Sequence, residues 1–166
     1  MKRRTWVRWI FLGIGAIVLL VLLVATYQVL RPVRLEKLSL SDLSGVSVNL
    51  DSLFQDKHTI LNFWATWCKP CIAEMPMLDS VHQLLDKDKW QLLLISDEPV
   101  ERIAEFMSKR PFTLPVLRST QGLASMGVAA LPKTLIVDEE MQVLYKKTGE
   151  LTMRAEEMLE IVRKVE

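Results

Sequence analysis

The pattern of apolar and polar positions divides the chain into one long apolar segment near the N-terminus and a body of shorter alternating stretches. Trp9–Leu30 is a run of 22 residues without a charged side chain. A helix of ~20 apolar residues crosses the ~30 Å hydrocarbon core of a membrane. The pattern therefore predicts a single transmembrane helix over 9–30, a short N-terminal segment over 1–8 and a charged linker over 31–37, interrupted by Pro32.

The body, expected over 38–166, alternates stretches typical of strands with stretches typical of helices. Apolar runs predict two buried strands over 59–65 and 90–96 and a short strand within 112–117. Turn residues between apolar stretches predict hairpins over 38–50 and 135–147. Helical spacing of apolar residues predicts helices over 70–85, 100–107, 121–126 and 155–165. This order of elements indicates an α/β domain with a mixed central sheet flanked by helices.

Charge is distributed unevenly along the chain. Six basic residues and no acidic residue lie within positions 1–34. The other fifteen basic residues face all twenty acidic ones, so positions 35–166 carry a net charge of −5. An acidic body does not indicate nucleic acid binding.

The same charges predict the orientation in the membrane. Four basic residues precede the apolar run closely, and two or three follow it. The positive-inside rule then places residues 1–8 in the cytoplasm and the body on the periplasmic or extracytoplasmic side of the inner membrane. A cleaved signal peptide is the alternative, but Leu23-Val24-Ala25 lacks the first small residue of an Ala-x-Ala site, so we favour an uncleaved signal anchor.

The only two cysteines, Cys68 and Cys71, form a C-x-x-C motif where the strand over 59–65 meets the next helix. Such a motif can bind zinc, attach haem, ligate an iron–sulfur cluster or perform redox chemistry. The only histidines, His58 and His82, lack the spacing of a structural zinc site, and two cysteines are too few for an iron–sulfur cluster. Ile72 stands where haem attachment needs histidine. Ala65 also disfavours a peroxide-reducing T-x-x-C site. Redox chemistry remains, without a metal or cofactor.

The position of the pair at the start of a helix explains how that chemistry would work. The helix N-terminus and the Lys69 cation favour the thiolate of Cys68, which we expect to be the exposed nucleophile. Cys71, one turn further on, would resolve the mixed disulfide. Pro70 suits a first helical turn, and with Lys69 it is expected to tune the pair. Glu74 shares the face of Cys71; if buried, it would have a raised pKa suited to proton transfer, and otherwise it is a solvated acid.

The segment from Asn62 to Pro76, NFWATWCKPCIAEMP, resembles the active site of thioredoxin-fold proteins of the TlpA/ResA type, which are membrane-anchored thiol-disulfide oxidoreductases. The resemblance covers residues 38–166. A second segment, GVAALPKT over 127–134, resembles the loop that carries a cis-proline opposite the disulfide. The resemblance implies that Pro132 is cis, that the backbone of Leu131 pairs with an extended substrate, and that the two cysteines form a disulfide.

The resemblance also assigns Trp67 to the substrate groove, and two departures from the family pattern affect the interpretation. Asn62 stands where many thioredoxins have aspartate, so the role of the buried acid passes to Glu74. Lys133 follows the cis-proline, where relatives in cytochrome c maturation often have glutamate, which argues against an apocytochrome substrate. Between Cys71 and Pro132 no room is left for the helical insertion of a DsbA-like oxidant, which favours a reductant.

The sequence thus predicts a membrane-anchored disulfide reductase that acts on protein disulfides and receives electrons from a membrane donor of the thiol-disulfide type. A dithiol oxidase or disulfide isomerase of the same fold is the nearest alternative. A non-catalytic module that binds a partner, or carries only a structural disulfide, is the alternative from a different class.

Overall fold

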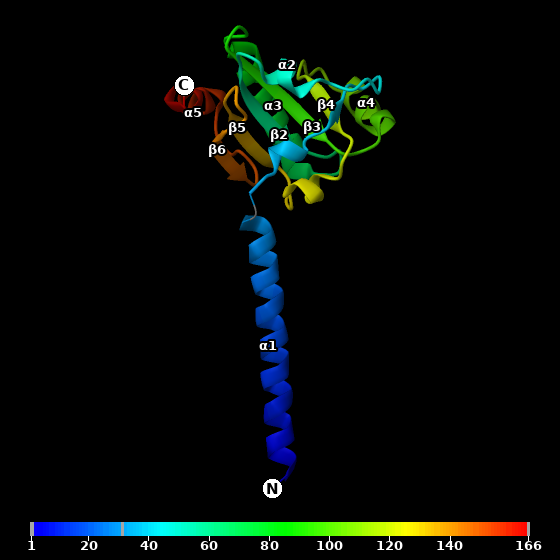
Figure 1. Cartoon of the computed structure of the whole chain (residues 1–166), viewed down its shortest axis with the longest axis vertical. Helices are drawn as coiled ribbons and strands as arrows, with labels where there is room; N and C mark the ends of the chain where they lie inside the picture. Colours follow the sequence, from blue (N-terminus) through cyan, green and yellow to red (C-terminus); the bar gives the residue numbers. More distant parts are fainter. Residues whose placement is uncertain (1, 31, 166) are drawn as a thin grey trace. The chain divides into compact units, whose positions relative to one another are not determined.

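The computed structural model of the chain describes residues 2–30 and 32–165 (Figure 1). Arg31, the first residue of the expected linker, lies outside them, as do Met1 and Glu166. The chain forms two compact units, Met1–Val33 and Arg34–Glu166. The first contains helix α1 (Lys2–Leu30), in which Trp9–Tyr27 is long and apolar enough to cross a membrane.

The second unit starts within the expected linker. Residues Leu35–Lys37 form the short 3-10 helix η1, and the Leu35 side chain is buried. The amide of Arg34 donates to the carbonyl of Met126 at 2.8 Å. These contacts attach the last part of the predicted linker to the folded domain.

A six-stranded mixed sheet forms the centre of this domain, in the order β1-β4-β3-β2-β5-β6. The strands are β1 (Leu40–Ser41), β2 (His58–Phe63), β3 (Trp90–Ser96), β4 (Val116–Ser119), β5 (Lys133–Val137) and β6 (Val143–Thr148). β2, β3 and β4 run parallel, whereas β1, β5 and β6 pair antiparallel with their neighbours. The sheet is therefore mixed, as the sequence predicts.

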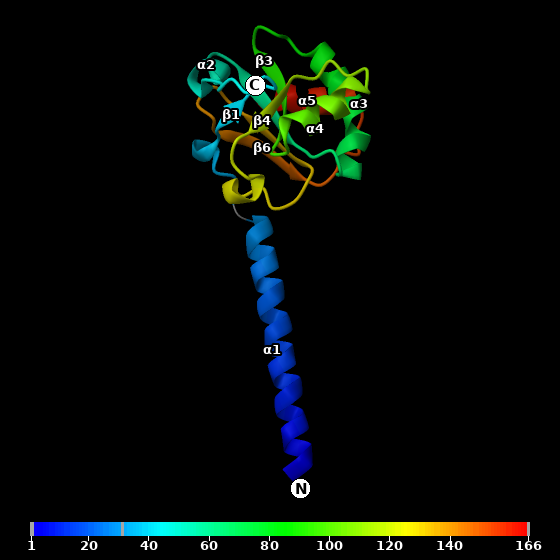
Figure 2. The same ribbon diagram turned by 90° about the vertical axis from the view of Figure 1, so that its right-hand side faces the viewer.

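The remaining helices are α2 (Leu50–Phe54), α3 (Lys69–Leu84), α4 (Val100–Ser108), the 3-10 helix η2 (Leu123–Met126) and α5 (Ala155–Val165). Figure 2 shows α3, α4 and α5 on the same side of the sheet. Their buried residues form one hydrophobic cluster with that face, including Ile60, Leu94, Met75, Ile103 and Met158. The other face is buried too, because Phe63 and Leu93 are at most 4% exposed. Burial on both faces explains why β2 and β3 are apolar runs.

The N-terminal hairpin expected over 38–50 forms with a short second arm: Ser41 pairs antiparallel with Ser47, and the amide of Val48 donates to the carbonyl of Leu40 at 2.9 Å. β1 also pairs with β4 at the edge of the sheet. The side chain of Asn49 accepts a hydrogen bond from the amide of Ser52 at 3.1 Å and so caps α2. Because asparagine at this position favours a helix start, the predicted second arm of the hairpin leads into a helix.

Candidate active site

The two cysteines form a disulfide where β2 leads into α3. Cys68 has extended backbone geometry at the N-cap of α3, and Cys71 lies in its first turn, after Pro70. Cys68 is 4% exposed and Cys71 is fully buried. Cys68 is therefore buried in the disulfide form and not exposed as the sequence predicts, although of the two cysteines it alone keeps any exposed surface. The amides of the first helical turn lie at the same end of the helix.

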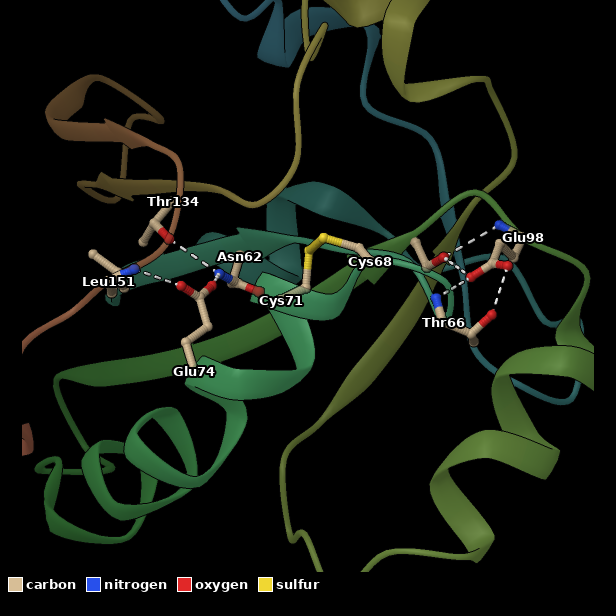
Figure 3. Close-up of a disulfide and its surroundings, with 9 residues drawn as sticks. Asn62, Thr66, Cys68, Cys71, Glu74, Glu98, Thr134 and Leu151 are labelled. Carbon is tan, nitrogen blue, oxygen red and sulfur yellow. Dashed lines mark hydrogen bonds between the residues drawn. A yellow bond between two sulfur atoms is a disulfide. The ribbon is translucent and has the colours of Figure 1, made fainter.

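A polar network borders the disulfide on the side of Cys71 (Figure 3). The carboxylate of Glu74 accepts hydrogen bonds from Asn62 Nδ2 at 2.7 Å and from the amide of Leu151 at 2.7 Å. Asn62 Nδ2 also donates to Thr134 Oγ1 at 3.0 Å. Glu74 is 2% exposed, so of the two readings of this residue the structure supports the buried acid.

Burial raises the pKa of Glu74 above its ordinary value, and the nearby Glu150 raises it further. The hydrogen bonds from Leu151 and Asn62 lower the pKa, but the effect of burial is larger. A carboxyl group whose pKa is raised by burial can exchange a proton closer to neutral pH.

A second buried carboxylate lies on the side of Cys68 (Figure 3). Glu98 is 7% exposed and follows the end of β3. Its two oxygens accept hydrogen bonds from the amide and the hydroxyl of Thr66, at 2.6 and 2.8 Å. Neither Glu98 nor Thr66 stands out in the sequence as a candidate site residue.

The pairing of the two central strands could have identified this contact. β2 and β3 are parallel, with Phe63 opposite Ile95. Continuing this register by three residues places Thr66 opposite Glu98. Residues that follow neighbouring parallel strands meet at the carboxyl edge of a sheet, where α/β proteins bind their ligands.

The other candidate residues occupy different environments. The Leu131–Pro132 bond is cis, as the family resemblance implies, and Pro132 is buried. Trp67 is 69% exposed, and Lys69 is exposed beside it at the start of α3. Lys133 is buried in β5, and its pKa is lowered by burial and by the nearby Lys146.

The described part of the chain, residues 2–30 and 32–165, has no cluster of three or more histidine, cysteine, aspartate or glutamate side chains that could hold a metal ion. The absence of a metal or cofactor from the reaction stays a prediction.

Comparison with known proteins places this geometry in a family. The chain matches the AhpC/TSA family over residues 34–146. It is 34% identical to the thiol-disulfide oxidoreductase ResA of Geobacillus thermodenitrificans over 116 residues, which cover 68% of this chain and 66% of that protein. It is 30% identical to ResA of Bacillus thuringiensis over 128 residues, which cover 75% of this chain and 72% of that protein.

The structures of known proteins give the same fold. The lipoprotein thioredoxin Etrx1 of Streptococcus pneumoniae superposes with a TM-score of 0.63 at 22% identity, covering 76% of this chain and 97% of that one. At this identity the likeness shows the thioredoxin-like fold alone. Together with the two ResA proteins, these matches show that the chain belongs to the AhpC/TSA family, as a thioredoxin-fold relative of thiol-disulfide oxidoreductases.

Proposed function

We propose that the chain is a membrane-anchored thiol-disulfide oxidoreductase that reduces disulfides of extracytoplasmic proteins through Cys68 and Cys71. The observation that carries this proposal is a cysteine pair at a helix N-terminus in which Cys68 keeps 4% of its surface exposed and Cys71 keeps none. Unpaired amides and the helix dipole favour a thiolate at this position.

The reaction consists of two exchanges between sulfur atoms. The thiolate of reduced Cys68 attacks one sulfur of a substrate disulfide, and the other substrate sulfur leaves as a thiolate. Cys71 then loses its proton and attacks Cys68, which frees the second substrate sulfur and forms the Cys68–Cys71 disulfide. The substrate gains two electrons, which the two cysteines lose. A membrane donor of the thiol-disulfide type would return the enzyme to its dithiol form.

Glu74 is the candidate proton acceptor for the second exchange. It lies one turn after Cys71 on the same helix and on the same side of the disulfide. Its raised pKa is caused mainly by burial, and this suits a group that takes the proton of the Cys71 thiol and later returns it. Asn62 holds the carboxylate from the sheet.

The loop before β5 supports binding of an extended substrate chain. Among the described residues, none makes a hydrogen bond with the backbone of Leu131, which precedes the cis-proline. A substrate strand could therefore pair with it, as peptides pair with exposed strand edges. Trp67, exposed beside Cys68, offers an apolar contact for the same chain.

Two further features support a reductase in the inner membrane. Between Cys71 and Pro132 the chain forms only the rest of α3, β3, α4, β4 and η2, without an inserted helical domain. The apolar segment of α1, with its preceding cations, supports a single-pass anchor over 9–30, residues 1–8 in the cytoplasm and the 38–166 domain in the periplasm.

Lys133, after the cis-proline, makes an apocytochrome in cytochrome c maturation the less favoured substrate.

Trapping in cells tests the proposal. A Cys71→Ala variant cannot resolve the mixed disulfide, so we expect it to accumulate substrates bound to Cys68 that dithiothreitol releases. A Cys68→Ala, Cys71→Ala double variant is the matched control and should trap nothing. If the single variant also traps nothing, the chain is a binding module or carries a structural disulfide. If substrates are trapped, the reduction potential of the cysteine pair, measured against glutathione, distinguishes a reductase from an oxidase or isomerase.

A further inference from the structure

The residues between β2 and α3 form a tight turn that presents Cys68. The amide of Cys68 donates to the carbonyl of Ala65 at 3.1 Å, which closes the turn over Thr66 and Trp67. A β-turn of this kind leaves the amide of its second residue, here Thr66, without a partner inside the turn. The position of Cys68 therefore depends on what holds Thr66 from outside.

Glu98 holds Thr66 with both of its oxygens. Oε2 accepts from the Thr66 amide at 2.6 Å and Oε1 accepts from the Thr66 hydroxyl at 2.8 Å. Hydrogen bonds to an ionised carboxylate are shorter and stronger than bonds between neutral groups. Because both bonds come from Thr66, they fix the position and the orientation of this residue together.

Glu98 is itself held on several sides. Its amide donates to Ser96 Oγ at 3.3 Å, and its carbonyl accepts from Arg118 Nε at 3.1 Å. Arg102 NH1 contacts the carboxylate at 3.5 Å. The loop after β3 is thus tied to β3, β4 and α4, and Glu98 connects this support to the turn before Cys68.

We propose that Glu98 is a positioning residue for Cys68. This inference rests on the exchange reaction proposed above. Its carboxylate holds the Ala65–Cys68 turn so that the sulfur of Cys68 points along the line of an incoming disulfide. Exchange requires this alignment, because the attacking, central and leaving sulfurs lie in a row. Glu98 exchanges no proton and forms no covalent bond in the step.

The domain contains a second contact of the same kind that serves as an internal control. Asp79, in the second half of α3, accepts from the amide of Thr113 at 2.8 Å and from its hydroxyl at 2.9 Å. It joins α3 to the segment before β4 and is not part of the turn before Cys68. Both bonds end on Asp79 Oδ1, so Asp79→Asn removes the charge of a carboxylate–threonine contact without changing the proposed support of Cys68.

The test compares Glu98→Gln with Asp79→Asn in the full chain in detergent micelles. Glutamine keeps the shape of glutamate, but an NH2 group replaces one carboxylate oxygen, so the charge and one of the two bonds that Glu98 accepts from Thr66 are lost. Two rate constants of the reduced protein are measured: reduction of insulin, which requires alignment, and alkylation by iodoacetamide, which requires only a thiolate. We expect Glu98→Gln to slow insulin reduction about 10- to 100-fold and to leave alkylation within about threefold of the wild type. Asp79→Asn should change neither rate.

Substitutions of Thr66 provide a second route if Glu98→Gln does not fold. Thr66→Val removes the hydroxyl donor alone and should slow insulin reduction less than Glu98→Gln does. Thr66→Ser keeps both donors and should reduce insulin at the wild-type rate. Wild-type insulin reduction in Glu98→Gln, or an equal decrease of both rates, overturns the proposal.

Exchange of the Thr66 amide with deuterium separates this inference from the proposed function. If the wild type itself does not reduce insulin, the proposed function fails. Faster exchange of this amide in Glu98→Gln than in Asp79→Asn would still support the hold on the turn, and unchanged exchange would overturn it.

Discussion

Replacing Glu74 by glutamine should change how the stability of the domain depends on pH. Glu74 accepts hydrogen bonds from Asn62 and Leu151. Glutamine can accept one of these bonds, and if its oxygen turns to the Leu151 amide, Asn62 still has Thr134 as an acceptor. In acid the protonated carboxyl of Glu74 also offers one carbonyl oxygen as its main acceptor, so the variant should lose at most about one hydrogen bond, which lowers the free energy of unfolding by no more than about 0.5–1.5 kcal/mol.

The pKa of Glu74 determines how this difference changes as the pH rises. In the folded protein burial holds the pKa above its ordinary value of 4.5. Between the two values the unfolded chain releases a proton that the folded protein keeps, so the wild type is destabilised as the pH rises through this window. Each unit of the window removes ~1.4 kcal/mol from the free energy of unfolding. Glutamine does not titrate, so the variant escapes this loss.

Urea unfolding of residues 34–166, followed by tryptophan fluorescence with the disulfide intact, measures the effect. This part of the chain is a compact unit with its own hydrophobic cluster. The advantage of the wild type over Glu74→Gln should shrink from about pH 4 upwards and then become constant or reverse. Glu101→Gln, at an exposed position of α4, is the control and should leave the pH dependence unchanged. An advantage that stays constant or grows between pH 4 and 9 would refute the reasoning.

Two further predictions concern the core and the membrane anchor. Met75→Ala, at a fully buried position of α3, should lower the free energy of unfolding by about 2–5 kcal/mol in urea, whereas Leu84→Ala, at a position 63% exposed, should change it by less than about 1 kcal/mol. Alkaline phosphatase fused after Glu166 should be active, because it folds only outside the cytoplasm. Activity of a cytoplasmic reporter at the same site would contradict the orientation.

Local patterns predict most of the fold. The apolar runs over 59–65 and 90–96 form β2 and β3, and the hairpin over 135–147 forms β5 and β6. The predictions of β2 and β3 are confirmed because strands covered on both faces are continuously apolar. The hairpin is confirmed by the antiparallel pairing of β5 with β6, although most of β6 is exposed. The hairpin over 38–50 forms with a shorter second arm, because the pairing of β1 with β4 and the capping of α2 by Asn49 depend on contacts that short-range patterns do not contain.

The candidate site divides in the same way. The position of Cys68 at the start of a helix can be predicted from the motif and Pro70. The partners of the two acids cannot, because Leu151 lies 77 residues from Glu74 and Glu98 lies 32 residues from Thr66. Such contacts are determined by the order and register of the strands. Only the register between β2 and β3 would have placed Glu98 beside Thr66.

The two buried acids differ in their surroundings more than in their chemistry. Burial raises the pKa of Glu74 and the anionic Glu150 adds to this effect, although the hydrogen bonds from Asn62 and Leu151 oppose it. Glu98 accepts from both donors of Thr66 and faces the Arg102 cation. An acid with a raised pKa is suited to carry a proton for Cys71. An acid with donors on both oxygens is suited to hold the turn that carries Cys68. One disulfide thereby has a proton acceptor on the side of the resolving sulfur and a support on the side of the attacking sulfur.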